Sequence, residues 1–339
     1  MRKRRLRFAF QTEAARGDDF VAIEYLLRQS GLKSTMKRIV TGLLGLLSFV
    51  SIVSAADKKI VLIAGGRSHG VGDHEFRAGC LLLQRCLEGF PGVTTVVVSN
   101  GWPQDVTVFD DAAAVLIYSD GGGGHPFIKP DRMKIIDGLV AKGVGLGAGH
   151  YGVEVPKGDP GAAMLRWIGG YFDPFYSVNP HWDGAFTNFP SHPITSGVKP
   201  FKIRDEWYYH MRFPDDMKGV TPLLTAVPPD STRGKPGSSS SHGGNPEVQK
   251  HMGEPEHVMW SFERPDGGRG FGFTGGHFHK NWGDENFRKI FLNALLWIAK
   301  VDVPKGGVSS APTPEQLKEN LDEKGRPKPA APPTPGAAK

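Results

Sequence analysis

The chain has 339 residues, of which 39% are hydrophobic and 10% aromatic, a composition that fits one large α/β domain with additional segments. Its formal net charge is +6, but residues 1–56 contain ten of the 41 Lys and Arg residues and four of the 35 Asp and Glu residues. The remaining residues carry 31 charges of each sign and no net charge. This balance excludes the basic surface typical of proteins that bind nucleic acid.

Residues 36–56 have the layout of a secretory signal peptide. A basic start at Met36 is followed by an apolar run over residues 39–53 and by small residues up to Ala56, so we expect cleavage after position 55 or 56. The apolar run is shorter than the roughly 20 residues of a membrane span, which predicts a secreted or periplasmic protein without a stable membrane anchor. We interpret residues 1–35 as an N-terminal extension that arises from a start codon assigned too early.

The first half of the predicted domain, which spans residues 57–303, alternates between strands and helices. Apolar, β-branched runs that end at glycine or serine indicate buried parallel strands. The resulting β-α-β-β-α-β order predicts a three-layer, doubly wound, mostly parallel sheet of the flavodoxin-like type. The predicted strands are 58–65, 94–99, 113–119 and 144–149, and the predicted helices are 73–90 and 130–142.

The pattern becomes less regular after residue 155. Strands are predicted at 221–227, 257–263 and 270–275, and a long mobile loop is predicted at 228–245. An amphipathic helix follows at residues 281–301. The Pro-, Ala- and Lys-rich composition of residues 304–339 predicts a disordered tail.

Polar side chains follow several predicted strands, where ligands bind in doubly wound sheets. Six of the twelve histidines lie in these loops, together with Asp120 and Glu154. Because the carboxyl ends of parallel strands meet at one edge of a sheet, we expect these groups to line one cleft. The six histidines are His69, His74, His125, His150, His277 and His279.

The segment Gly147–Gly152 resembles the nucleophile elbow of class I glutamine amidotransferase-like proteins, with His150 in place of the nucleophilic cysteine. The glycines at 121–124 are similar to the loop that supplies oxyanion-binding amides in that fold. A histidine at the elbow resembles the ThuA-like (trehalose-utilisation) branch of this superfamily, and the resemblance covers roughly Lys58–Val303. Further segments similar to that family are 191–197, 205–208, 268–277 and 293–297.

The two cysteines, Cys80 and Cys86, lie in a predicted helix and not at the elbow, so we interpret them as core residues. Thiol-dependent amidotransfer is therefore excluded, because it needs a cysteine beside a base. Acid–base chemistry by histidine, metal-assisted chemistry and ligand binding without chemistry remain open. The resemblance implies a small carbohydrate partner, a glycoside or keto-glycoside.

We assign candidate roles to the residues near the predicted cleft. His277 and His279 form an H-x-H pair whose rings would share one face if the pair lay on a strand. Each assignment has a structural alternative, since turn histidines, exposed carboxylates and core aromatic residues are common. The candidate catalytic residues are His150, His277 and Glu154; the candidate ligands of a divalent metal such as zinc are His69, His74, His150, His277 and His279; the candidate substrate-binding residues are Gly121, Gly122, Gly123, His125, Asp205, Glu206 and Trp282.

Two hypotheses follow from these assignments. The first is an exported enzyme that processes a carbohydrate with His150 at its centre. The second is a non-catalytic module that binds a carbohydrate or a metal on an amidotransferase-like fold. A scaffold whose tail contacts a cell-envelope partner is a third alternative, and the sequence carries no signal for an oligomeric state.

Overall fold

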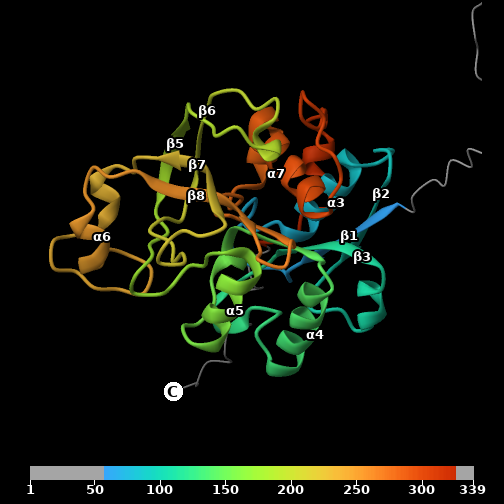
Figure 1. Cartoon of the computed structure of the whole chain (residues 1–339). Coiled ribbons are helices and arrows are strands. Elements are labelled where there is room, and N and C mark those ends of the chain that lie inside the picture. Colours follow the sequence, from blue (N-terminus) through green and yellow to red (C-terminus); the bar gives the residue numbers. More distant parts are fainter. Residues whose placement is uncertain (1–56, 326–339) are drawn as a thin grey trace, which may run out of the picture. The chain divides into compact units, whose positions relative to one another are not determined.

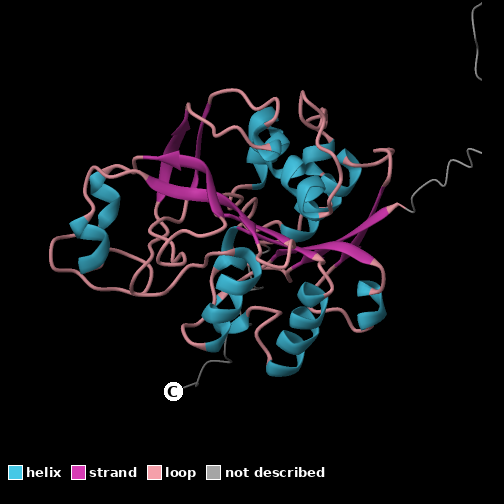
Figure 2. Ribbon diagram, viewed as in Figure 1, coloured by secondary structure: helices cyan, strands magenta, loops and turns pink. Residues whose placement is uncertain are grey.

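A seven-stranded sheet organises the computed structural model, which describes residues 57–325 (Figures 1 and 2). The strand order is β2-β1-β3-β4-β9-β8-β7, with parallel pairing from β2 to β9 and antiparallel pairing from β9 to β7. A separate antiparallel pair is formed by β5 and β6. The predicted doubly wound, mostly parallel α/β fold is confirmed. The predictions for residues 1–56 lie outside the described residues.

The strands and helices follow the chain in an order close to the predicted one. The strands are β1 (Lys58–Ala64), β2 (Val93–Val98), β3 (Ala112–Tyr118), β4 (Gly145–Gly149), β5 (His181–Phe186), β6 (Phe201–Glu206), β7 (Val220–Ala226), β8 (Glu256–Glu263) and β9 (Arg269–Phe273). The α-helices are α3 (Phe76–Cys86), α4 (Pro130–Ala141), α5 (Asp159–Ile168), α6 (Pro246–Lys250) and α7 (Glu285–Ile298). Among the described residues, no helix is long and apolar enough to span a bilayer.

The two faces of the parallel sheet are covered by different helices, with α3 and α7 on one face and α4 and α5 on the other (Figure 1). Successive side chains of β1 alternate between the two faces, as the pleat of a strand requires. Ile60 and Leu62 therefore pack in the core beneath α3 and α7, whereas Val61 and Ile63 pack in the core beneath α4 and α5. Both cores are apolar, which explains the uninterrupted hydrophobic runs of the strands.

Strand β4 is built largely of glycine because its neighbours approach its backbone closely. A Cβ atom at Gly147 would collide with the ring of Phe271, and one at Gly145 would collide with the carbonyl of Ile298. The absence of these side chains lets β9 and the end of α7 pack against β4. Strand β4 thus ends at the centre of the sheet, between β3 and β9, and presents the elbow there.

The sequence does not predict four α-helices and strands of the structure between residues 155 and 255, namely α5, β5, β6 and α6. Helix α5 follows Gly158, has a proline in its first turn and ends at Gly169 in the left-handed conformation, a pattern typical of helix boundaries. Strand β5 alternates exposed and buried residues, as expected when one face of a sheet is solvated. The predicted mobile loop at 228–245 also contains a fully buried side chain, that of Arg233.

The first part of the predicted disordered tail differs in the structure. Residues 304–325 run back over the domain and include a short 3₁₀-helix, η7 (Gln316–Lys318). The Nζ atom of Lys324 lies 3.2 Å from the Oε1 atom of Glu75, and both side chains are buried. The amide of Asp322 donates a hydrogen bond to the other oxygen of Glu75 at 2.7 Å. Specific polar contacts hold this segment in place despite its Pro-rich composition.

Candidate functional site

His150 lies at the elbow directly after β4, where it begins the 3₁₀-helix η3 (His150–Val153). Its side chain is fully buried and its φ angle is +50°, in the left-handed region that side chains other than glycine rarely adopt. The Nδ1 atom lies 2.9 Å from the carbonyl oxygen of Thr274, which follows β9. Since a carbonyl can only accept, Nδ1 carries a proton, and Nε2 is the ring nitrogen that faces the rest of the site.

His74 approaches His150 from the loop between β1 and α3, also with a positive φ angle, of +48°. Its Nδ1 atom lies 2.9 Å from the Oδ1 atom of Asp120, which follows β3 and also accepts a hydrogen bond from the Ser68 hydroxyl at 2.8 Å. The carboxylate fixes the proton on Nδ1 of His74. The Nε2 lone pair of His74 therefore faces Nε2 of His150 across 3.0 Å.

His277 and Glu206 complete the cluster from the loop after β9 and the end of β6. The Nδ1 atom of His277 lies 2.8 Å from Oε2 of Glu206 and 3.0 Å from Nε2 of His74. Oε2 of Glu206 lies 3.4 Å from Nε2 of His150. We call the group formed by His74, His150, His277 and Glu206 the histidine centre.

The side chains around the histidine centre hold its outer members in position. Buried Asp205 accepts hydrogen bonds from the amides of Gly276 and His277 at 2.8 and 3.0 Å. The side-chain amide of Asn179 donates to Oε1 of Glu206 at 3.0 Å, which leaves Oε2 directed at the histidines. Asp205 is thus a positioning residue for the backbone of His277.

The pKa shifts follow from burial and from these contacts. Burial, with a smaller contribution from the neighbouring imidazoles, lowers the pKa of His74 to about 3 although Asp120 opposes the shift, so His74 is neutral at pH 7. Burial alone would raise the pKa of Glu206, but its close contacts with the His150 and His277 imidazoles hold this pKa well below its ordinary value. Burial lowers the pKa of His277, yet the hydrogen bond and charge of Glu206 outweigh it and raise this pKa.

The donor atoms of the histidine centre suit a divalent metal ion. One ligand atom from each residue lies within 4.8 Å of all the others. In tetrahedral zinc sites with bonds of 2.0–2.1 Å, neighbouring ligand atoms are about 3.3 Å apart, close to the separations of 2.8–3.4 Å between paired atoms in the centre. Metal-bound histidines also donate their second N–H to a carboxylate or carbonyl, as His74 and His150 do.

A model of the family described as "Trehalose utilisation", ThuA, matches residues 82–298. The chain belongs to the ThuA family. Two solved structures share its fold, each a putative ThuA-like protein. The Bacteroides uniformis protein has a TM-score of 0.50 and 14% identity over 75% of this chain and 96% of its own, and the Parabacteroides merdae protein has a TM-score of 0.51 and 17% identity over 74% and 92%. A comparison with curated proteins finds no match.

Three of the candidate metal ligands, His74, His150 and His277, meet in this ThuA-family protein, and His69 forms a second possible ligand group with His74 and Asp120. His69 lies at the rim, where its ring stacks on that of His74 with centroids 3.6 Å apart and its side chain is 44% exposed. Its Nδ1 atom is 3.8 Å from Asp120 Oδ1. His69 is therefore an accessible imidazole beside the buried centre.

The H-x-H pair does not act as a unit, because the chain leaves β9 at Phe273 and turns into the 3₁₀-helix η6 (His279–Gly283). The predicted strand geometry therefore does not apply to His277 and His279. His279 is buried outside the histidine centre, and neither of its ring nitrogens has a hydrogen-bond partner among the described residues. Burial lowers its pKa.

Several other candidates have neighbours that give them structural roles. The carboxylate of Glu154 pairs with Nε2 of His242 at 3.0 Å, not with the centre. The ring nitrogens of His125 are occupied by the carbonyl of Gly152 and the amide of Phe127, at 3.0 and 3.1 Å. Trp282 is fully buried against aromatic core residues and offers no exposed face for a sugar ring.

The glycine loop packs on the elbow instead of presenting free amides. A Cβ atom at Gly121 would collide with the carbonyl of Tyr151. The amide of Gly122 donates to the carbonyl of Glu154 at 3.0 Å and is therefore committed inside the protein. Only Gly123 of the three predicted substrate-binding glycines borders open space.

Sequence reasoning placed Glu206 in the site but as a substrate-binding residue, whereas its Oε2 atom lies among the imidazole nitrogens. Asp120 was noted after its strand without a role. The signal that could have found it is its position at the end of β3, the neighbour of the elbow strand. Carboxylates at the ends of adjacent parallel strands can orient a histidine on the next loop.

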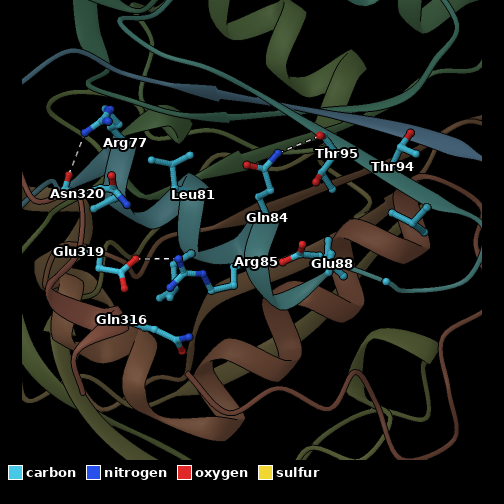
Figure 3. Close-up of a pocket in the computed structure, with 15 residues that line it drawn as sticks. Arg77, Leu81, Gln84, Arg85, Glu88, Thr94, Thr95, Gln316, Glu319 and Asn320 are labelled. Carbon is cyan, nitrogen blue, oxygen red and sulfur yellow. Dashed lines mark hydrogen bonds and ion pairs between the residues drawn. The ribbon is translucent and has the colours of Figure 1, made fainter. Parts of the chain in front are cut away.

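Several cavities lie outside the histidine centre. One of them, of about 670 Å³, lies between α3, the start of β2 and residues 316–320, and its wall includes no histidine (Figure 3). Ion pairing of Arg85 with Glu319 at 2.7 Å crosses it. A second cavity of about 390 Å³ includes Asp120 and therefore adjoins the histidine centre.

Proposed function

We propose that this ThuA-family protein is exported and processes a carbohydrate, a glycoside or keto-glycoside, at the histidine centre with the help of a divalent metal ion such as zinc. The observation that carries the proposal is the convergence of three imidazole nitrogens and one carboxylate oxygen on a common point. The family description supports a carbohydrate as the substrate class.

The charges of the centre favour a cation. His74 and His150 direct their Nε2 atoms inward and toward each other, because their Nδ1 atoms are engaged by Asp120 and by the carbonyl of Thr274. Glu206 is ionised, and among the described residues it forms ion pairs only with histidines. Facing lone pairs repel unless a proton or a metal ion lies between them.

A bound divalent ion would supply Lewis-acid chemistry toward a carbonyl or hydroxyl oxygen of the sugar. The protein itself would supply orientation and proton transfer. His69 suits proton transfer, since its ring lies against His74 and is accessible to a substrate. Glu206 and His277 would share a proton in the absence of the ion.

The alternative function is a module that binds a carbohydrate or metal without turnover. One observation favours it: the amide of Gly122 is already hydrogen-bonded to Glu154, so the glycine loop offers one fewer donor to a developing oxyanion than an amidotransferase-like loop would.

The test compares the purified full chain with a His150→Ala variant and a His251→Ala control, whose imidazole is exposed and paired with Glu254. We expect one zinc ion per chain, measured by elemental analysis after dialysis, in the wild type and the control and none in His150→Ala. Chromatography measures the turnover of disaccharides and their keto forms. We expect turnover in the two proteins that contain zinc and none in His150→Ala.

Equal metal content in all three proteins would contradict the metal centre. If the protein binds stoichiometric metal and binds a sugar that stays intact, with no turnover of any sugar tested, the binding-module function is supported and the enzyme function is contradicted.

A further inference from the structure

The order of the strands marks a second place where a ligand can bind. The order β2-β1-β3-β4 reverses direction between β1 and β3, and ligands of open α/β sheets bind in the crevice outside the strand ends at such a switch point. The cavity of about 390 Å³ lies there, lined by the loops after β1, β2 and β3. Its volume is in the range of about 300–1,000 Å³ that is usual for small-molecule sites. We call it the switch-point pocket.

Two guanidinium groups line the switch-point pocket. Arg67, in the loop after β1, is exposed and forms no hydrogen bond or ion pair with any residue from 57 to 325. Arg132, in the first turn of α4, donates one N–H to the carbonyl of Pro126 at 2.9 Å, and its guanidinium lies 5.2 Å from the centre of the Trp102 ring. These contacts orient Arg132 and leave most of its donors available.

The indole of Trp102 is itself fixed in place. It packs against the rings of Phe109 and Phe127, with centroids 5.6 and 5.9 Å away. The backbone on two sides of the pocket is open, because a Cβ atom at Gly66 or at Gly124 would meet no atom within 4 Å. A ligand can therefore approach the main chain at both glycines.

Asp120 connects the switch-point pocket with the histidine centre. It lines the pocket, while its Oδ1 atom accepts hydrogen bonds from His74 and Ser68. It is the one acidic residue of the lining, and its Oδ1 atom is already engaged by these two bonds. The two positive charges of the arginines thus outnumber the single negative charge of the lining, and that carboxylate is already hydrogen-bonded to His74 and Ser68.

We propose that the switch-point pocket binds a negatively charged group of the substrate, a carboxylate or a phosphate, whose sugar ring extends toward the histidine centre. This inference rests on the proposed function and narrows the substrate class to acidic saccharides. Guanidinium groups form charge-assisted, often bidentate hydrogen bonds with both kinds of anion, whereas a neutral sugar would leave two cations without a partner.

The test measures binding of inorganic phosphate, glucuronate, glucose 6-phosphate and glucose by calorimetry at fixed ionic strength. The full chain is used after metal removal, so that phosphate does not report on zinc. We expect the anions to bind at least about tenfold more tightly than glucose, and the preference between glucuronate and glucose 6-phosphate identifies the carboxylate or the phosphate as the recognised group. Equal binding of glucose and both acidic sugars would overturn the proposal.

Two arginine variants and a matched control make the test specific. Arg67→Met removes an exposed side chain without internal contacts, and Arg132→Met removes the oriented guanidinium. Lys134→Met removes one positive charge from the exposed side of the same helix, outside the pocket. We expect each arginine variant to weaken anion binding about tenfold and the lysine variant to leave it unchanged. If all three variants weaken anion binding equally, the loss is explained by the net charge of the protein, and the inference is overturned.

The same measurements on His150→Ala separate this inference from the proposed function. Anion binding that persists in this variant, together with zinc content that does not depend on residue 150, would contradict the metal centre alone. Zinc content that depends on His150 without anion binding in any protein would contradict the switch-point pocket alone.

Discussion

Two buried histidine–glutamate groups in this protein look alike in composition and differ in charge. In the histidine centre, Glu206 forms ion pairs only with imidazoles among the described residues. Near β8, His210 lies 3.4 Å from Oε1 of Glu256, and Nη1 of fully buried Arg233 lies 3.2 Å from the same oxygen. We call this second group the arginine network.

The difference shows what distinguishes a structural polar network from a candidate site. Arg233 also donates to the carbonyls of Val248 and Glu254 at 3.2 Å, so the arginine network carries its own permanent cation. No Lys or Arg side chain within residues 57–325 forms an ion pair with a residue of the histidine centre. A group of inward-facing acceptors without a resident cation can take one from solution.

The largest expected effect concerns the arginine network. Arg233→Met leaves the buried carboxylate of Glu256 without its cation, which should cost about 3–5 kcal/mol of the free energy of unfolding. Urea denaturation monitored by tryptophan fluorescence measures this loss. Zinc content per folded chain should stay the same; a fall in both quantities would mean that the two groups are coupled and would weaken the comparison.

A substitution in the histidine centre should lower zinc affinity, whereas the substitution in the arginine network should lower the free energy of unfolding. Glu206→Gln keeps the shape of the side chain but removes the only carboxylate among the four ligands, so we expect zinc affinity to fall about 100-fold, or about 2.7 kcal/mol. Calorimetric titration with zinc provides the measurement, with Glu256→Gln as the matched control. Comparable zinc binding by the two glutamine variants would rule out Glu206 as a ligand.

His125 represents a third kind of buried histidine, one whose ring nitrogens are satisfied by the backbone. Burial lowers its pKa to about 4, although its hydrogen bond with the Gly152 carbonyl opposes the shift. As the pH falls below about 6.5, His125 becomes protonated in the unfolded chain, whereas in the folded protein it stays neutral until about pH 4. The free energy of unfolding should therefore decrease by about 1.4 kcal/mol per pH unit from this residue, or about 2 kcal/mol by pH 5.

Denaturation at pH 7 and at pH 5 checks this contribution. The His125→Asn variant should lose less stability between the two pH values than the wild type does. Identical losses in both proteins would show that His125 does not contribute to the pH dependence.

Sequence reasoning recovered the parallel half of the sheet because its strands are buried on both faces and appear as continuous apolar runs. It also brought His74, His150 and His277 together, since each lies in a loop at a strand end. The position of Glu206 was harder to predict. Strand β6 contains charged residues such as Lys202 and Arg204 at exposed positions, and only its pairing with β5 brings Glu206 to the histidines.

The tail illustrates the opposite error, in which composition obscured specific contacts. Proline, alanine and lysine predicted disorder for all of residues 304–339, yet Lys324 finds a buried carboxylate on Glu75. Composition reports the average ability of a segment to bury apolar surface. A single ion pair with a residue far away in the sequence cannot be detected from the composition of the segment.

The ion pair between Lys324 and Glu75 also bears on when the site can form. Glu75 is the immediate neighbour of His74, so the loop that carries His74 is held by one of the last described residues. Ribosomes build a chain from its N-terminus, and early segments fold first. We therefore expect this loop to gain its final anchor only after residue 324 has been synthesised.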